Sequence, residues 1–262
     1  MDLHNYLLEE IGPPTDEQEI HKRIRGQDCP FKEGTLLNRN MHPLIKDVIL
    51  ESSRTALRNH YDSLSDDDFN GYIRDKPRFE AREKYLAFLV ENIRAETPRT
   101  VIEGGCGRGH DAVFIAGEFP GVHFDAYDIS ERNIESAIRR AEKYDIRNAG
   151  FSVSPHEDFS FPKGTEMIYL HSAFGEERKI FIGEEYIDMI DDFRMTLFTR
   201  ALKKGGSLII SFYVPKVTLH MGGGYYNSFG PDIENHGFKP MHSDIIYNEN
   251  GRQHNVFHYK KS

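Results

Sequence analysis

The sequence predicts an α/β protein. We expect a Rossmann-like, doubly wound and mostly parallel sheet with a C-terminal antiparallel hairpin and an N-terminal helical cap. Three observations predict it. From residue 99 onward, short apolar segments of strand length alternate with segments of helical periodicity, which is typical of βαβ units. A glycine-rich segment, residues 104–109, follows the first of these strands. Near the C-terminus, Asn250-Gly251 separates two strand-like segments, which is a strong hairpin signal.

Composition limits the classes of partner. The 262 residues suffice for one large domain or for one domain with an extension, and the formal net charge is -9. An acidic chain has no overall positive field for polyanions, so we expect neither a nucleic acid nor a membrane as partner. Cys29 and Cys106 lie far apart, which indicates a reduced, cytoplasmic setting without a disulfide framework or a zinc site. The longest apolar stretch, near residues 208–214, is far below the ~20 residues that span a bilayer.

The first part of the chain differs in pattern from the rest. We expect residues 1–98 to form a helical cap and residues 99–262 to form the main domain. Within the cap, one helix follows Pro43 and a second covers residues 78–93, where apolar side chains recur at helical spacing. Residues 1–40 either cover a ligand or form a homodimer contact, and the sequence leaves both roles open.

The elements of the main domain follow from periodicity and end signals. Ser130 is the expected N-cap of the second helix, and Gly205-Gly206 is expected to break the chain before the fifth strand. The expected strands are residues 100–103, 122–128, 151–153, 167–171 and 207–214, with hairpin strands at 244–248 and 254–260, and the expected helices are 112–119, 134–141 and 186–197.

The glycine segment carries the first functional signal. Four glycines in six positions permit positive φ angles and let a ligand approach the main chain closely. Asp128 ends the second strand, where a carboxylate can accept hydrogen bonds from both ribose hydroxyls, although such a residue also caps helices. After the third strand, Asp158 can accept from an adenine amino group and Phe159 can cover the purine, unless this acidic loop is only solvated.

Two nucleotide-like ligands fit this arrangement. Gly107, Gly109 and Ala112 match the G-x-G-x-x-A pattern of nicotinamide cofactors, with Asp128 downstream. However, that register begins too late for a tight strand-to-helix turn, and the carboxylate of Glu103 at the turn disfavours a pyrophosphate. A cationic ligand tolerates this carboxylate. A nicotinamide-dependent oxidoreductase therefore remains as the alternative function.

The same segments resemble a known family. Residues 101–109, 127–130 and 202–210 look like the first motif, the second motif and the fifth-strand entry of the class I S-adenosylmethionine-dependent methyltransferase superfamily, small-molecule type. The resemblance implies S-adenosyl-L-methionine as cofactor, with its methionine moiety on residues 105–109, its ribose on Asp128 and its adenine near Asp158. Tyr61 resembles the tyrosine of cofactor lids. The cofactor-binding residues expected are Tyr61, Glu103, Gly104, Gly105, Gly107, Asp128, Ile129, Asp158 and Phe159.

This sequence departs from the family pattern at three positions. Gly104 stands where an apolar residue is usual, Arg108 where a small one is, and Glu103 replaces the commoner aspartate. These departures concern the geometry of the loop rather than the class of cofactor.

The resemblance implies methyl transfer to a small-molecule acceptor by in-line displacement. Alignment of the two reactants supplies most of the rate, and a general base is needed only if the acceptor must lose a proton. His171 ends the fourth strand and His220 follows the fifth, so both are candidate bases, with polar loop residues as the alternative reading. A non-catalytic S-adenosylmethionine-binding protein is a further alternative. The expected substrate-binding residues are His171, Glu177, Tyr225 and Tyr226, and no metal site is expected.

Overall fold

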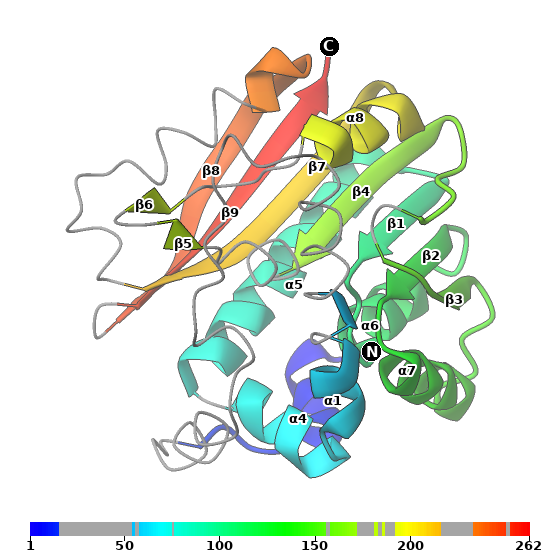
Figure 1. Ribbon diagram of the computed structural model, residues 1–262. Helices are drawn as coiled ribbons and strands as arrows, with labels where there is room; N and C mark the ends of the chain where they lie inside the picture. The colour runs from blue at the N-terminus through cyan, green and yellow to red at the C-terminus, as the bar shows by residue number, and fades with distance from the viewer. Residues whose placement is uncertain are drawn as a thin grey trace.

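A seven-stranded sheet forms the centre of the computed structural model (Figure 1). The model describes residues 1–15, 54–55, 58–74, 76–155, 158–171, 181–182, 185–186, 192–215, 233–249 and 252–262. The strand order is β3-β2-β1-β4-β7-β9-β8. The strands are β1 (Thr100–Gly104), β2 (His123–Asp128), β3 (Ala149–Val153), β4 (Thr165–His171), β7 (Leu202–Pro215), β8 (Phe238–Glu249) and β9 (Arg252–Lys261).

The sheet is parallel from β3 to β7, whereas β9 runs antiparallel to both β7 and β8. The mostly parallel, doubly wound sheet with its C-terminal hairpin is therefore confirmed. Both hairpin strands are longer than expected, and the turn residues Asn250 and Gly251 lie outside the described residues. A separate small sheet pairs β5 (Phe181–Ile182) with β6 (Glu185–Tyr186).

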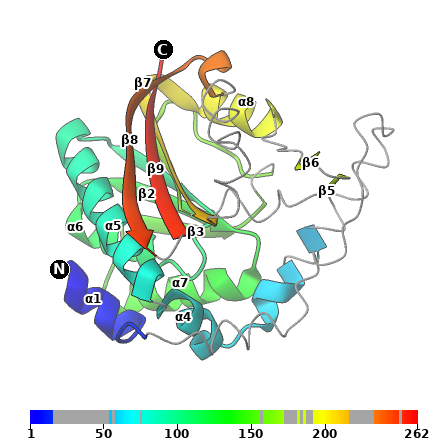
Figure 2. The same cartoon turned by 90° about the vertical axis from the view of Figure 1, so that its left-hand side faces the viewer.

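Helices cover both faces of the large sheet (Figures 1 and 2). One face packs against α5 (Lys76–Glu96) and α6 (His110–Glu118), and α1 (Leu3–Glu10) extends the same apolar cluster. Beside them, α7 (Glu131–Lys143) packs on β2 and β3. The opposite face holds α8 (Asp192–Ala201), and α4 (Asp66–Arg74) lies near the glycine segment. Among the helices of the described ranges, none has the length and apolarity that crossing a membrane requires.

Two local expectations are wrong. Tyr186 was expected to begin a helix, but it lies in β6 and the helix α8 begins at Asp192. The pair Gly205-Gly206 does not interrupt the chain before the fifth strand, because β7 already begins at Leu202 and runs through both glycines. The pairing of β7 with β4 shifts register there, and Gly205 adopts a φ of 76°. The glycines therefore allow an irregularity within the strand rather than a break before it.

Other local expectations are confirmed. The helix predicted over residues 78–93 lies within α5, and the side chain of Ser130 caps α7 by accepting a hydrogen bond from the backbone N–H of Asn133 at 3.1 Å. The helix predicted after Pro43 falls largely outside the described residues.

The contact between α6 and α7 depends on Gly109, which precedes α6. A Cβ atom at this position would lie 2.6 Å from the Cβ of Ala137 on α7, and the backbone φ is 72°. Only glycine therefore satisfies both the close approach of the helices and the left-handed backbone.

We predict that Gly109→Ala lowers the free energy of unfolding by about 2–4 kcal/mol, because overpacking and an unfavourable φ add together. Urea unfolding followed by circular dichroism measures this change. Gly121→Ala is the matched control, since no atom lies within 4 Å of its added Cβ, and it should stay within about 0.5 kcal/mol of the parent protein. Equal stability of the two variants would contradict the packing argument.

Candidate functional site

The glycine loop, residues 104–109, connects β1 to α6 at the carboxyl end of the sheet. Gly105 and Gly107 have φ angles of 66° and 53°, so the loop uses the left-handed backbone that its glycines permit. The backbone N–H of Cys106 donates to the carbonyl of Tyr127 at 3.0 Å, which holds the loop against the end of β2. At Gly105 and Gly107, therefore, no Cβ atom covers the main chain at the edge where open α/β sheets bind ligands.

Asp128 lies directly beside this loop and is buried. Its Oδ2 accepts the backbone N–H of Gly107 at 2.9 Å, and its Oδ1 accepts from the Ser130 backbone N–H and the Asn133 side chain at 2.9 and 3.1 Å. Burial raises the pKa of this carboxyl above its usual value. Since a carboxylate has about four acceptor positions, three are already used and Oδ2 keeps the free one. The residue therefore both shapes the loop and offers an acceptor to a ligand hydroxyl.

Glu103 is a second buried acid, on the face of the sheet that α5 and α6 cover. The hydroxyl of Tyr169 donates to its Oε2 at 2.9 Å. Burial raises the pKa of Glu103 well above its usual value, and the nearby charge of Asp111 raises it further. Glu103 therefore holds its proton readily in the free protein, and a cation near it would favour the ionised form.

His171, at the end of β4, forms a hydrogen-bonded pair with Asp111 from α6. Its Nδ1 lies 2.6 Å from Oδ2 of Asp111, and the guanidinium of Arg82 lies 3.0 Å from the other carboxylate oxygen. Burial favours a raised pKa for Asp111, but Arg82 and His171 together lower it below the usual value. Burial lowers the pKa of His171. The pair is thus an ionised carboxylate that orients a neutral imidazole.

Two aromatic rings adjoin this histidine. The ring of Tyr85 lies 4.3 Å from that of His171, and the ring of His254 from β9 lies at 5.4 Å. Burial lowers the pKa of His254 well below its usual value, and His171 lowers it further. Both imidazoles are therefore neutral near pH 7.

Arg108 joins the segment before α5, residues 58–74, to the glycine loop. This arginine is only 1% exposed. Its guanidinium pairs with Asp66, donates to the carbonyl of Leu64 at 2.8 Å and lies 4.6 Å from the ring centre of Phe69. The ring of Phe69 also covers the loop, because a Cβ on Gly107 would lie 3.1 Å from it. The sequence pointed to Arg108 only as a departure from a small residue and did not predict this role.

A second set of hydrogen bonds joins this segment to the start of α7. The Ser130 hydroxyl donates to Asp62 at 2.6 Å, and the backbone N–H of Arg132 donates to the same oxygen at 3.3 Å. Arg58 donates to the carbonyl of Ile129 at 3.3 Å. Asp62 therefore lies beside Asp128, whose pKa its charge raises. The sequence pattern pointed to the neighbouring Tyr61 and not to Asp62.

Some of the remaining expected residues lie within the described ranges, and the others lie outside them. Tyr61 packs on the ring of His60, whereas Asp158 is exposed and Phe159 stacks on Tyr127 at 4.0 Å between ring centres. Gly104 ends β1, and Ile129 is buried after β2. The structure thus brings Glu103, Gly105, Gly107, Asp128 and Ile129 together around the loop. His220, Glu177, Tyr225 and Tyr226 lie outside the described residues.

Within the described ranges, no group of three or more His, Cys, Asp or Glu side chains is arranged to hold a metal ion.

Comparisons with known proteins agree on one class. The family model described as "Methyltransferase domain" matches residues 96–229. The fold is similar to that of magnesium protoporphyrin IX methyltransferase from Synechocystis PCC 6803 with bound SAH, at 15% identity and a TM-score of 0.58 over 80% of this chain and 100% of that one. It is also similar to geranyl diphosphate C-methyltransferase from Streptomyces coelicolor A3(2), at 13% identity and a TM-score of 0.50, with 70% and 83% coverage. No curated protein matches the sequence.

We predict that Arg108→Ala loosens the segment before α5, because the variant loses an ion pair, hydrogen bonds and the contact with Phe69. Unfolding free energy should fall by about 2–4 kcal/mol, and trypsin should cleave faster after Arg74. Arg108→Lys keeps the charge but lacks the planar guanidinium. We expect its unfolding free energy and its cleavage rate to lie between those of the parent protein and Arg108→Ala. If cleavage rates of all three proteins are equal, Arg108 does not hold this segment.

Proposed function

We propose, on the premise that this chain belongs to the methyltransferase domain family, that it methylates a small-molecule acceptor with His171 as the general base. The family makes the chain an S-adenosylmethionine-dependent methyltransferase, and S-adenosylmethionine is its cofactor. The observation that carries the proposed mechanism is the 2.6 Å hydrogen bond between His171 and Asp111 at the carboxyl end of β4.

The residues around the glycine loop fit this cofactor. Bound S-adenosylmethionine supplies a methyl group that its positive sulfonium activates for displacement. Gly105 and Gly107 present main chain without side chains, and Oδ2 of Asp128 keeps an acceptor position for a ribose hydroxyl. Buried Glu103, with its raised pKa, suits a cationic ligand better than a diphosphate. We include Tyr61, Gly104, Ile129, Asp158 and Phe159 in the proposed cofactor site.

His171 has the properties of a base near neutral pH. Because Asp111 engages Nδ1, Nε2 is the nitrogen that would take a proton from the acceptor. The lowered pKa of His171 keeps Nε2 unprotonated at pH 7. Asp111 stabilises the imidazolium that results, and Arg82 keeps Asp111 ionised.

A small acceptor agrees with the surroundings of this histidine. His171 is 6% exposed in its side chain, and the segment from residue 58 to α4 packs over the glycine loop, which leaves little room for a macromolecule. The net charge of -9 disfavours nucleic acid. His220 as a second base, and Glu177, Tyr225 and Tyr226 as acceptor contacts, belong to the same proposal.

The division into a cap, residues 1–98, and a catalytic domain, residues 99–262, is also part of the proposal. A cytoplasmic setting and a homodimer formed through the N-terminal region complete it. Sedimentation analysis of the full chain tests the homodimer.

The acceptor class is tested by incubating the protein with S-adenosylmethionine labelled in its methyl group and a fractionated cell extract. We expect label in the small-molecule fraction. Label confined to protein or nucleic acid would contradict the proposed acceptor class, and label in no fraction would favour a binding protein without turnover. Calorimetric titrations with S-adenosylhomocysteine and with NADH separate this function from the nicotinamide alternative.

We predict that Asp128→Ala weakens S-adenosylmethionine binding by about 1.5–3 kcal/mol, the scale of lost charge-assisted hydrogen bonds. Isothermal titration calorimetry measures this loss. Asp125→Ala is the matched control on the same strand, because the Asp125 side chain bonds the exposed His123 at the other end of β2. An unchanged dissociation constant for Asp128→Ala would place the ribose elsewhere.

We predict that kcat/KM is constant at neutral pH and falls on acidification, because protonation removes the base. The midpoint lies below about 6.5, the ordinary histidine value, since burial lowers the pKa of His171. Asp111→Asn removes a charge that raises this pKa, so it should shift the midpoint to lower pH and reduce kcat.

His171→Gln should lower kcat by about 10²–10⁴-fold and abolish this acidic limb, while cofactor affinity stays the same. A parent-like rate in His171→Gln would show that the acceptor needs no base at this position, without affecting methyl transfer itself.

A further inference from the structure

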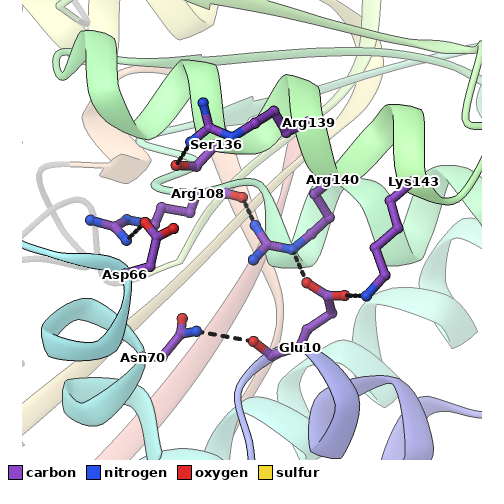
Figure 3. A pocket seen from close by; sticks show the side chains of 8 residues that line it. All are labelled: Glu10, Asp66, Asn70, Arg108, Ser136, Arg139, Arg140 and Lys143. Carbon is purple, nitrogen blue, oxygen red and sulfur yellow. Dashed lines mark hydrogen bonds and ion pairs between the residues drawn. The ribbon is translucent and has the colours of Figure 1, made fainter.

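A cavity of about 270 Å³ lies between the N-terminal helices and α7, on residues that the proposed mechanism does not use (Figure 3). Ser136, Arg139, Arg140 and Lys143 line it from α7. Their spacing of i, i+3, i+4 and i+7 places them on one face of the helix. Three cationic side chains and a hydroxyl group therefore face one space on an otherwise acidic chain.

Buried contacts fix part of this wall before any ligand binds. The Arg140 side chain is 10% exposed, and its guanidinium donates to Glu10 at 2.6 Å and to the backbone carbonyl of Arg108. Lys143 reaches the other oxygen of Glu10 at 2.5 Å. Arg139 donates to the Ser136 hydroxyl oxygen at 2.9 Å, so the Ser136 hydrogen remains available to an acceptor.

The opposite wall contributes an unsatisfied acceptor. On α4, the Nδ2 of Asn70 donates to the carbonyl of Glu10 at 3.1 Å, which assigns its amide orientation. Its Oδ1 is buried and has no hydrogen-bond partner among the described residues. A buried acceptor without a donor costs about 1–3 kcal/mol. A ligand that fills this cavity gains by bringing a hydroxyl group to Asn70.

The charges around the cavity favour an anion. Arg108, Arg139, Arg140 and Lys143 line it against Glu10 and Asp66, an excess of two positive charges. Asp66 is mostly exposed and already pairs with Arg108. Two further carboxylates, Glu9 and Glu135, contact Lys143 and Arg139 from exposed positions. Exposed pairs of this kind contribute about 0–1 kcal/mol, so a ligand anion can replace them.

We propose that this cavity binds a hydroxyl-bearing phosphate, either hydrogen phosphate itself or a small hydroxylated phosphate monoester. Its oxygens accept from Arg139, Lys143 and the Ser136 hydroxyl, and its hydroxyl donates to Oδ1 of Asn70. Arginine forks suit phosphate geometry, and the volume holds a phosphate with a small organic group. The residues that line this cavity do not include His171 or Asp111, and Arg140 connects the cavity to the glycine loop through the carbonyl of Arg108.

The test compares phosphate with sulfate on the full chain by isothermal titration calorimetry at constant ionic strength. Both anions are tetrahedral, but sulfate carries no hydroxyl at neutral pH and cannot donate to Asn70. We expect phosphate to bind about tenfold more tightly than sulfate. Glycerol 3-phosphate against inorganic phosphate distinguishes a monoester ligand from the free ion, because only a monoester site favours the organic group.

Two variants test separately the contributions of the α4 wall and the α7 wall of the cavity. Asn70→Ala should make phosphate and sulfate affinities equal, whereas Arg139→Ala should weaken both by about tenfold. Arg147→Ala is the matched control, because this exposed arginine pairs only with Asp145 among the described residues and should bind like the parent protein. Thermal melting checks that each variant folds.

Three results would overturn the proposal: no phosphate binding at tens of millimolar, equal binding by Arg139→Ala and the parent protein, or competition between phosphate and S-adenosylhomocysteine. The last would make the cavity part of the cofactor site. Because binding is measured without turnover, failure here leaves the proposed methyl transfer untouched.

Discussion

The carboxylate of Asp128 is the contact on which the rest of the site depends. It joins the backbone of the glycine loop, through Gly107, to the start of α7, through Ser130 and Asn133. These three donors also explain how an acid can remain at the buried end of β2, since hydrogen bonds offset part of the desolvation that raises its pKa. The same arrangement that shapes the loop therefore leaves one acceptor position of Oδ2 without a protein donor among the described residues.

A second buried group of polar residues lies behind the loop. Its two acids, Asp111 and Glu103, differ in how readily they ionise. Arg82 and His171 both contact Asp111 and keep it ionised, whereas Glu103 accepts a hydrogen bond from the Tyr169 hydroxyl and holds its proton more readily. Two acids close together in a dry environment rarely ionise together. As a result, the ionised Asp111 orients the neutral imidazole of His171, whereas a cation near Glu103 would favour its ionised form.

The N-terminal helices do more than cover apolar surface. Arg108, Asp62 and Glu10 each join them to the glycine loop or to α7 by charged hydrogen bonds. Arg140 contacts both Glu10 and the loop carbonyl, so the cavity beside α7 and the glycine loop share a wall.

The parallel sheet with its hairpin, the loop glycines, Asp128 at the end of β2 and the Ser130 cap could all be predicted from the sequence, because periodicity, caps and turns depend on residues close in the chain. The sequence pattern misplaced Tyr186 and the start of β7, where a glycine pair fits a break and a strand irregularity equally well. The contacts of Asp111 with His171, of Arg108 with Asp66 and of Arg140 with Glu10 could not be predicted in this way. These partners lie far apart in sequence, and how helices stack on a sheet is what brings them together.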